Sequence, residues 1–266
     1  MEYKIVFCDV DGTLVTSKKE VLPGTVAAVK RLEEKGIPFV IISGRFPPGI
    51  YSVQEEYGIS GPIISYSGGL IRDKDRNTLY STGFSTQTAA SVIDFIESSK
   101  LDCAWNVFYG DSWIVKDRTH PRVRYEEDFV HALASVGDVS SIPADTTVGK
   151  VLLMADPDVI DRAQELLQSA FPELTIVKSA SDYLEVMKGG ISKGKALKKM
   201  CGFLDIPVCA SIAFGDNYND EDMLMTAGMP FLMGNAPGPL KQRIPNITRS
   251  NDDDGISHAL HELGVI

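Results

Sequence analysis

The sequence predicts an α/β fold: a doubly wound, mostly parallel, Rossmann-like sheet with an inserted α/β domain that contains an antiparallel sheet. Two observations carry this prediction. Continuous apolar runs such as IPFVIIS (37–43) and SIAFGD (211–216) alternate with helix-periodic segments, as in parallel sheets that are covered by helices on both faces. Between residues 83 and 187 the pattern changes to helices mixed with a hairpin, which indicates a second unit.

The first core segment shows a regular strand and helix alternation. Apolar β-rich runs predict strands, whereas Pro at a helix start and Gly after its last turn bound the helices. In order, we expect a strand at 4–8, a helix from Pro23 to about Gly36, a strand at 37–43, a helix from Pro47 to about Gly58, and a single strand at 62–71.

The middle of the chain predicts the inserted domain. The runs DCAWNVFY and DSWIVKD flank Gly110 and read as a hairpin, hence as antiparallel strands. Helices are expected at about 86–98, 121–132 and 158–170, and strands at 148–155, 174–178 and 183–187. After Gly189 the core pattern returns, with a strand at 211–216, a helix at about 219–227, a strand at 229–233 and a terminal helix. We therefore assign residues 1–82 and 188–266 to the Rossmann-like core and residues 83–187 to the insert.

Charge and cysteine usage narrow the class of protein. The formal net charge of -10 argues against nucleic acid or an anionic membrane as a partner. No apolar run reaches the roughly 20 residues of a membrane span, and the first residues do not resemble a signal peptide. The four cysteines are scattered and are expected to be reduced thiols of a cytoplasmic protein. A monomer and a homodimer are both compatible with the sequence.

Acidic side chains follow two of the predicted core strands. Asp9 and Asp11 come directly after the first strand, and Asp216 ends the SIAFGD run. Ligands of open α/β sheets bind beyond the carboxyl ends of strands, and carboxylates that lie close together favour a hard cation such as Mg²⁺ between them. Simpler explanations stay open: Asp11-Gly12 is also a common turn pair, and Asn219 and Asp220 are residue types that cap helices.

Two further segments are suited to holding phosphate. Ser43 and Gly44 follow the apolar FVII run, where a hydroxyl and loop amides can bind phosphate oxygens at a helix start. Lys193 lies in the glycine-rich stretch GGISKGK, where a lysine can neutralise phosphate charge. Ser-Gly is also ordinary loop chemistry, and the lysine stretch could equally be a solvated helix start.

Taken together, these motifs resemble the haloacid dehalogenase-like superfamily. DVDGTL is similar to its first motif, IISGR to its second, SKGKAL to its third and GDNYND to its fourth, in the family's order. The large insert between the second and third motifs, and the loop MGNA at 233–236, resemble the Cof-type subfamily of phosphatases. Ser67-Gly68-Gly69 departs from the subfamily's usual Asn-Gly-Ala.

The resemblance implies a phosphatase that hydrolyses a small phosphorylated metabolite, such as a sugar phosphate, with Mg²⁺ as cofactor. Asp9 would be the nucleophile that forms an aspartyl-phosphate, and Asp11 the general acid and base. Mg²⁺ would bind the carboxylates of Asp9 and Asp216 and the backbone carbonyl of Asp11. The remaining assignments are phosphate contacts from Thr13, Ser43, Gly44, Lys193 and Asn219, and a supporting role for Asp220. The insert would act as a cap that contacts the leaving group, with Trp105, Trp113, Tyr109 and Arg124 as candidate specificity residues or, alternatively, packing residues.

Three other functions remain as alternatives. A phosphomutase could use the same aspartyl-phosphate but pass the phosphoryl group to a second hydroxyl. A P-loop nucleotide-binding protein fits G-x-x-x-x-G-K at 189–195, although Ala196 stands where a Ser or Thr would bind the metal. A non-enzymatic phospho-acceptor also uses acidic strand ends, but not this motif spacing.

Overall fold

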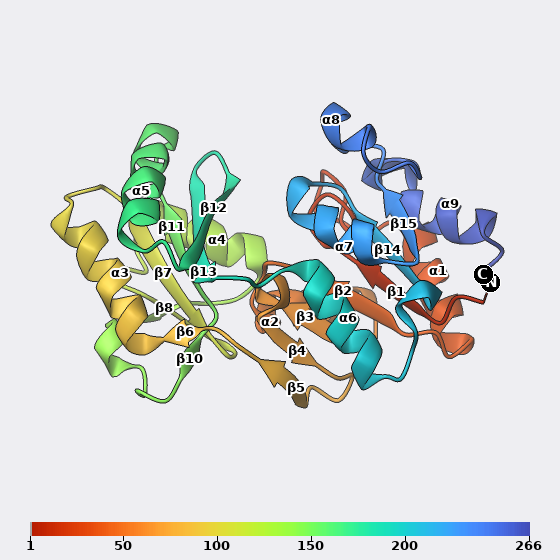
Figure 1. The fold of residues 1–266 in the computed structure, drawn as a ribbon, viewed down its shortest axis with the longest axis horizontal. Coiled ribbons are helices and arrows are strands. Elements are labelled where there is room, and N and C mark those ends of the chain that lie inside the picture. Colours follow the sequence, from red (N-terminus) through yellow and green to blue (C-terminus); the bar gives the residue numbers. More distant parts are fainter. Residues whose placement is uncertain (1) are drawn as a thin grey trace. The chain divides into compact units, whose positions relative to one another are not determined.

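The computed structural model describes residues 2–266, and the chain forms two compact units (Figure 1). The first comprises the chain up to Gly44 together with Val53–Tyr80 and Ser192–Ile266, and the second comprises Arg45–Ser52 and Ser81–Ile191. Residues 45–52 lie within the 1–82 segment that the sequence predicts to be part of the core. They group with the second unit because Phe46 packs edge-on against Trp113, with ring centroids 5.9 Å apart, and lies 5.1 Å from the ring of Phe108.

The first unit is built on a seven-stranded sheet in the order β15-β14-β1-β2-β3-β4-β5. Strands β15, β14, β1, β2 and β3 pair in parallel, whereas β4 runs antiparallel to β3. The strand bounds are β1 Ile5–Cys8, β2 Phe39–Ile42, β3 Ile63–Ser65, β4 Leu70–Arg72, β5 Thr78–Ser81, β14 Ser211–Gly215 and β15 Met229–Leu232. The central strands are buried along their whole length, as expected of a sheet with two covered faces.

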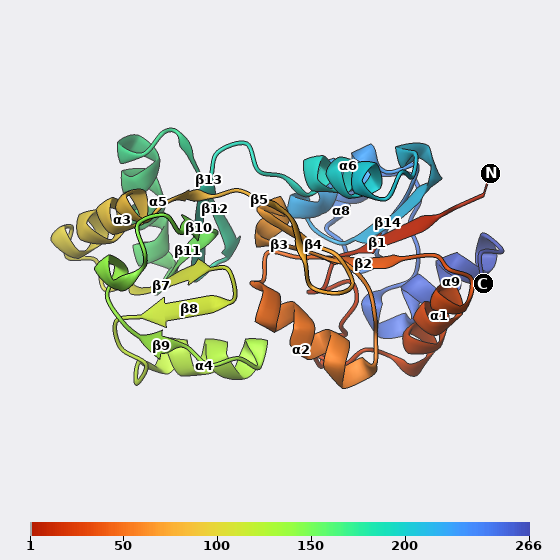
Figure 2. The ribbon, with the colours of Figure 1, turned by 90° about the horizontal axis from the view of Figure 1, so that it is seen from below.

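Helices cover both faces of this sheet, so the doubly wound prediction is confirmed. In Figure 2, α6 lies on one side of the sheet and α1 on the other. One core joins alternate residues of the strands, such as Phe7 and Ile42, to α6 and α7 through Leu197 and Leu224. The helices that contribute to this unit are α1 Pro23–Glu34, the later part of α2 Pro47–Tyr57, α6 Lys193–Phe203, α7 Glu221–Thr226, α8 Gly238–Lys241 and α9 Gly255–Glu262.

The predicted single strand at 62–71 is wrong in one respect. The chain reverses within it, so that β3 and β4 form an antiparallel pair around the short 3₁₀ helix η1, Tyr66–Gly68. All three residues of η1 have positive φ, including +115° at Gly68. The Ser67-Gly68-Gly69 stretch between the two apolar segments is the kind of sequence that marks a turn, and the single-strand prediction did not take it into account.

The second unit contains a six-stranded sheet in the order β12-β13-β11-β7-β8-β9, and a separate two-stranded pair, β10-β6. β7 and β8 form the predicted antiparallel hairpin. Bounds are β6 Phe84–Ser85, β7 Ala104–Tyr109, β8 Ser112–Val115, β9 Ser135–Val136, β10 Thr147–Val148, β11 Lys150–Met154, β12 Leu174–Ala180 and β13 Tyr183–Lys188, with helices α3 Thr86–Ser98, α4 Pro121–Val130 and α5 Pro157–Ala170. α3 and α5 share one core with the sheet.

Both tryptophans of the insert are packing residues. Trp105 lies in the core beneath α3 and donates its indole N–H to Glu97, at 3.0 Å. Trp113 stacks on Phe108 and donates to the side-chain oxygen of Asn106, also at 3.0 Å. Each is at most 5% exposed, as is usual for aromatic side chains that find a hydrogen-bond partner inside a protein. Among the described residues, no helix combines the length and apolarity that crossing a bilayer requires.

Candidate active site

The polar groups singled out in the sequence meet at one edge of the first unit's sheet. Asp9 directly follows β1, Ser43 follows β2 and Asp216 follows β14. Because β14, β1 and β2 are adjacent and parallel, their carboxyl ends lie at the same edge. Lys193 joins them from the first turn of α6, so the third motif reaches the same place from outside the sheet.

Lys193 bridges two carboxylates in the interior. Its Nζ donates to Asp9 Oδ1 at 2.6 Å and to Asp220 Oδ1 at 2.5 Å. The side chains of Lys193, Asp9 and Asp220 are 1%, 7% and 0% exposed. A buried charge is tolerated only when it is paired and hydrogen-bonded, and here each of the three charges has such a partner.

The cluster carries more negative than positive charge. Burial lowers the pKa of Lys193, but Asp220 and Asp9 outweigh it and hold that pKa above its usual value. Burial, and then repulsion from Asp220, raises the pKa of Asp9 well above its usual range despite Lys193. The same two causes raise the pKa of Asp216 to about 6. One lysine therefore does not balance three carboxylates, and a bound cation would relieve the remaining repulsion.

The donor atoms suit a hard divalent ion. One carboxylate oxygen each from Asp9, Asp216 and Asp220 lies within 4.8 Å of the others, and oxygen ligands are those that Mg²⁺ prefers. Asp220 is already engaged, because its Oδ1 binds Lys193 and its Oδ2 accepts from the amides of residues 216 and 217 at 3.0 and 3.1 Å. Asp9 and Asp216 are therefore the better metal ligands of the three, and Asp220 is placed to hold the lysine.

Gly12 permits the close approach of the first and fourth motifs. Its φ is +85°, and a Cβ at this position would lie 2.4 Å from Asp216 Oδ2, so a larger residue would push the two segments apart. The hydroxyl of Thr13 donates to Asp216 Oδ1 at 2.8 Å. Thr13, which the resemblance assigned to phosphate, thus contacts a carboxylate of the candidate metal site in this structure.

The remaining predicted site residues differ in how far their side chains are buried. Ser43 is buried, with its backbone N–H bonded to Ile64 O and its carbonyl accepting from Ser67 N, both at 2.9 Å. Gly44 follows it in the same loop. Asp11 is more exposed than Asp9 and faces Lys19 at 3.9 Å, which leaves its carboxylate accessible to water. Asn219 is exposed within the 3₁₀ helix η4, Tyr218–Asp220, and so lies outside the buried cluster.

Three further residues near this site are not indicated by the sequence motifs. Asp222 accepts a hydrogen bond from Gly194 N at 2.9 Å and so fixes the helix turn that carries Lys193. Asn235 and Asn251 contact the loop that follows Asp9. Asn235 lies in the MGNA loop, and the resemblance of that loop to the subfamily is the sequence feature that could have pointed to it. The sequence around Asn251 and Asp222 does not indicate which distant residues they contact.

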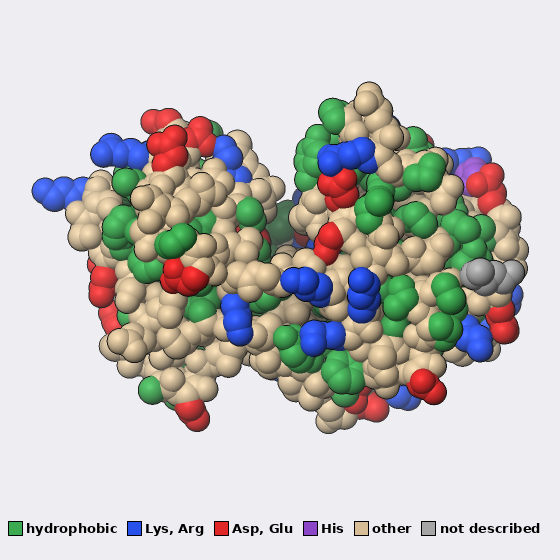
Figure 3. Space-filling view, viewed as in Figure 1, with side chains coloured by type: hydrophobic (Ala, Val, Ile, Leu, Met, Phe, Trp, Pro, Cys, Tyr) green, Lys and Arg blue, Asp and Glu red, His purple; other side chains and the backbone are tan. Residues whose placement is uncertain are grey.

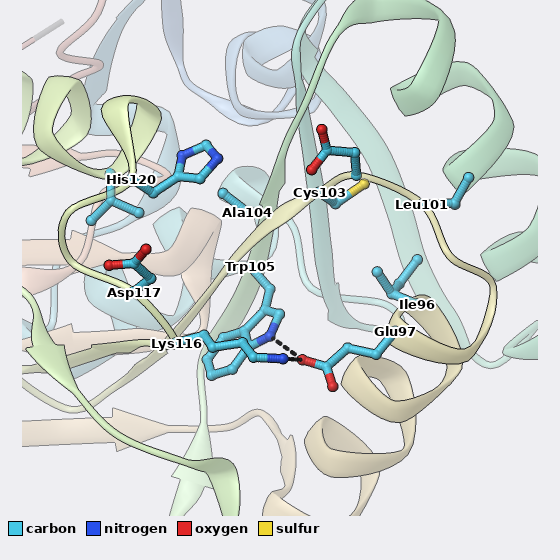
Figure 4. Close-up of a pocket in the computed structure, with 11 residues that line it drawn as sticks. Ile96, Glu97, Leu101, Cys103, Ala104, Trp105, Lys116, Asp117 and His120 are labelled. Atoms are coloured by element: carbon cyan, nitrogen blue, oxygen red, sulfur yellow. Dashed lines mark hydrogen bonds and ion pairs between the residues drawn. The ribbon is translucent and has the colours of Figure 1, made fainter.

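Two surface hollows lie away from these carboxylates. One, of about 390 Å³, is in the second unit, between the end of α3, the open end of the β7–β8 hairpin and the start of α4 (Figure 4). Its polar groups are largely engaged: Glu97 binds Lys116 at 2.8 Å, and His120 Nδ1 accepts from Arg122 N at 3.2 Å. The other, of about 670 Å³, lies in the first unit beside Lys4, Gly36 and Leu204. Neither brings together groups for catalysis.

The surface supplies local positive charge in an otherwise acidic chain. Lys195, Lys198 and Lys199 are exposed on α6, and basic side chains gather over this helix (Figure 3). Lys199 lies 4.2 Å from the ring centroid of Tyr80. Since Lys193 begins the same helix, an anionic ligand would meet a basic helix beside the carboxylates despite the net charge of -10.

Comparison with known proteins agrees with this geometry. The family model described as haloacid dehalogenase-like hydrolase matches residues 6–260. A Haemophilus influenzae protein provisionally named a phosphatase is 33% identical, with 98% of each chain covered. An HMP-PP phosphatase of Yersinia pseudotuberculosis is 26% identical, covering 97% of this chain and 94% of its own. The crystal structure of a haloacid dehalogenase-like hydrolase from Bacteroides thetaiotaomicron superimposes with a TM-score of 0.90 at 26% identity, covering 98% of this chain and all of that one. These matches confirm the resemblance drawn from the motifs, and the chain belongs to the haloacid dehalogenase-like hydrolases.

Proposed function

We propose that the protein is a Mg²⁺-dependent phosphatase that hydrolyses a small phosphomonoester through an aspartyl-phosphate on Asp9. The observation that carries this proposal is the Asp9 carboxylate at the end of β1, held by Lys193 at 2.6 Å within the Asp9–Asp216–Asp220 cluster. Family membership and the phosphatase names of two relatives support it.

The proposed reaction uses the two aspartates in turn. An oxygen of Asp9 attacks the phosphorus atom, and the bond from phosphorus to the substrate oxygen breaks as Asp11 gives that oxygen a proton. Water then attacks the phosphorus of the aspartyl-phosphate while Asp11 takes a proton from it. The bond to Asp9 breaks, inorganic phosphate is released, and both aspartates return to their starting state.

The other side chains hold charge and position. Asp9, Asp216 and the Asp11 carbonyl would hold Mg²⁺, which supplies positive charge against the phosphoryl oxygens. Lys193, Ser43, Gly44 and Thr13 are proposed to hold the phosphoryl group, and Asp220 to orient Lys193 through the 2.5 Å contact. Asn219 is proposed as a further phosphate contact.

The test is phosphate release from a panel of phosphorylated metabolites that includes sugar phosphates and HMP-PP, because one relative is named for HMP-PP. We expect turnover with Mg²⁺, none in excess chelator, and a loss of at least about 10³-fold in Asp9→Asn. Asp205→Asn is the matched control, since Asp205 is exposed with φ of +53°, a conformation that Asn tolerates. Wild-type turnover by Asp9→Asn would rule out the nucleophile, and an isomeric sugar phosphate in place of free phosphate would favour a phosphomutase.

A second part of the proposal concerns the insert. The subfamily resemblance suggests that it contacts the leaving group and selects the substrate. Exchanging it for the insert of a relative should change the order of preferred substrates but leave the Mg²⁺ requirement intact. An unchanged preference would count against this role.

A further inference from the structure

Two asparagines from the C-terminal part of the chain bind the loop that follows Asp9. Asn235, in the loop after β15, donates from Nδ2 to the carbonyl of Gly12 at 2.8 Å. Asn251, in the 3₁₀ helix η5 (Asn251–Asp253), donates from Nδ2 to the carbonyl of Val15 at 2.9 Å. The two are joined, because the backbone N–H of Asn251 donates to Asn235 Oδ1 at 3.2 Å. The three bonds form a continuous chain, which we call the asparagine latch.

The asparagine latch binds loop carbonyls that do not take part in the hydrogen bonds within the loop. Within the loop, the amides of Thr13, Leu14 and Val15 bind the carbonyls of Asp9 and Val10 at 3.0–3.3 Å. The carbonyls of Gly12 and Val15 take the two carboxamides instead. The loop's own hydrogen bonds thus hold its first residues. The two asparagine side chains hold its middle, at Gly12, and its end, at Val15.

The position of Gly12 sets the spacing between the first and fourth motifs. Its Cα leaves no room for a Cβ beside Asp216, and it separates Asp11 from Thr13, whose hydroxyl binds Asp216 Oδ1. A shift of the Gly12 carbonyl would therefore change the position of Asp11 relative to Asp9 and Asp216. Misplacement of catalytic groups by about 1 Å can cost about 10²-fold in rate.

From this geometry we infer that Asn235 and Asn251 are positioning residues, which place the Asp9–Asp11 loop against Asp216 without touching the reacting atoms. A carboxamide suits position 235 because it donates to Gly12 O and accepts from Asn251 N at once. A carboxylate there would lose the donor and face the Gly12 carbonyl with negative charge. Because Asn235 is exposed, its bonds contribute little to stability, and the effect should appear in catalysis.

This inference rests on the proposed phosphatase function, so its test has one arm that does not need turnover. We would compare Asn235→Asp, Asn235→Ala, Asn251→Ala and the double alanine variant with the wild type. Asn246→Asp is the matched control, because Asn246 also lies after β15 and its carboxamide, among residues 2–266, binds only the sulfur of Met229, at 3.3 Å. The readouts are kcat and KM for phosphate release, the thermal midpoint, and hydrogen–deuterium exchange of the peptide spanning 9–16.

We expect kcat to fall about 10–100-fold in Asn235→Asp at nearly unchanged KM and thermal midpoint. Exchange in peptide 9–16 should quicken in the Asn235 and Asn251 variants but not in the control, and the double variant should lose less than the sum of the single losses. Wild-type kcat and exchange in Asn235→Asp would overturn the latch, as would a loss explained by lower thermal stability. If the wild type released no phosphate, the proposed function would fall, and the exchange arm would still decide whether the latch holds the loop.

Discussion

At the scale of single residues, the candidate site contains more negative than positive charge. Three carboxylates and one ammonium group share a small buried volume, and the raised pKa values of Asp9 and Asp216 record the surplus of negative charge. Such repulsion weakens the folded state unless a cation is bound. The carboxylates of this candidate metal site therefore cost stability while no cation is bound.

Asp216→Asn should stabilise the metal-free protein. The folded-state pKa of Asp216, about 6, lies above its unfolded value, so its stabilising contribution is complete only below the unfolded pKa and is lost as the pH rises through 6. Asparagine carries no charge, so the substitution removes this loss of stability. Its side-chain oxygen can still accept the hydrogen bond from the Thr13 hydroxyl. We expect a gain on the order of 2 kcal/mol in the free energy of unfolding at about pH 8, shrinking toward about pH 4.5. Urea denaturation in chelator at both pH values checks this, and an equal difference at both would contradict it.

At the scale of elements, η1 supports the start of α6. A Cβ on Gly68 would come 2.8 Å from the Ser192 carbonyl, and Ser192 caps the helix that carries Lys193. The reversal that separates β3 from β4 therefore also fixes where the third motif begins. The Ser67-Gly68-Gly69 departure from the subfamily pattern keeps a glycine at this position, where φ is +115°.

Gly68→Ala should lower both stability and turnover. We expect a loss of about 3 kcal/mol, from unfavourable φ and from overlap with Ser192 O, together with reduced kcat because Lys193 shifts. Gly58→Ala is the control: its φ is +62° but a Cβ there meets nothing within 4 Å, so it should cost only about 1 kcal/mol and leave kcat unchanged. Chemical denaturation and phosphate release measure the two effects, and equal losses in both variants would refute the contact.

At this scale the sequence could predict single strands and helices and the residues at their ends. Apolar runs that end in Asp9, Ser43 and Asp216 predicted strands in one parallel sheet, and hence that these residues would lie at one edge. The reversal at Tyr66–Gly68 was missed because the prediction followed the apolar periodicity and not the turn residues between the two apolar segments. Contacts such as Asn235 with Gly12 and Asp222 with Gly194 join segments 28 or more positions apart, and only the folded chain brings them together. The catalytic roles of the site residues stay predictions.

At the scale of the whole molecule, metal binding and folding should be linked. A ligand that binds only the folded state at 100 times its Kd stabilises it by about 2.7 kcal/mol. We expect Mg²⁺ to raise the thermal midpoint of the wild type and of Asp205→Asn, and to have almost no effect on Asp216→Asn. A thermal scan with and without chelator shows this directly. A similar rise in Asp216→Asn would place the cation elsewhere.

The grouping of Arg45–Ser52 with the second unit has a consequence for building chimeras. A donor insert grafted at residues 81 and 191 alone would leave Phe46 without the Phe108 and Trp113 rings on which it packs. Because Arg45 directly follows the Ser43-Gly44 pair, that mismatch would fall next to the loop that we propose holds phosphate. The transplantable module is therefore discontinuous, and a clean exchange must carry the short 45–52 segment along with the long one.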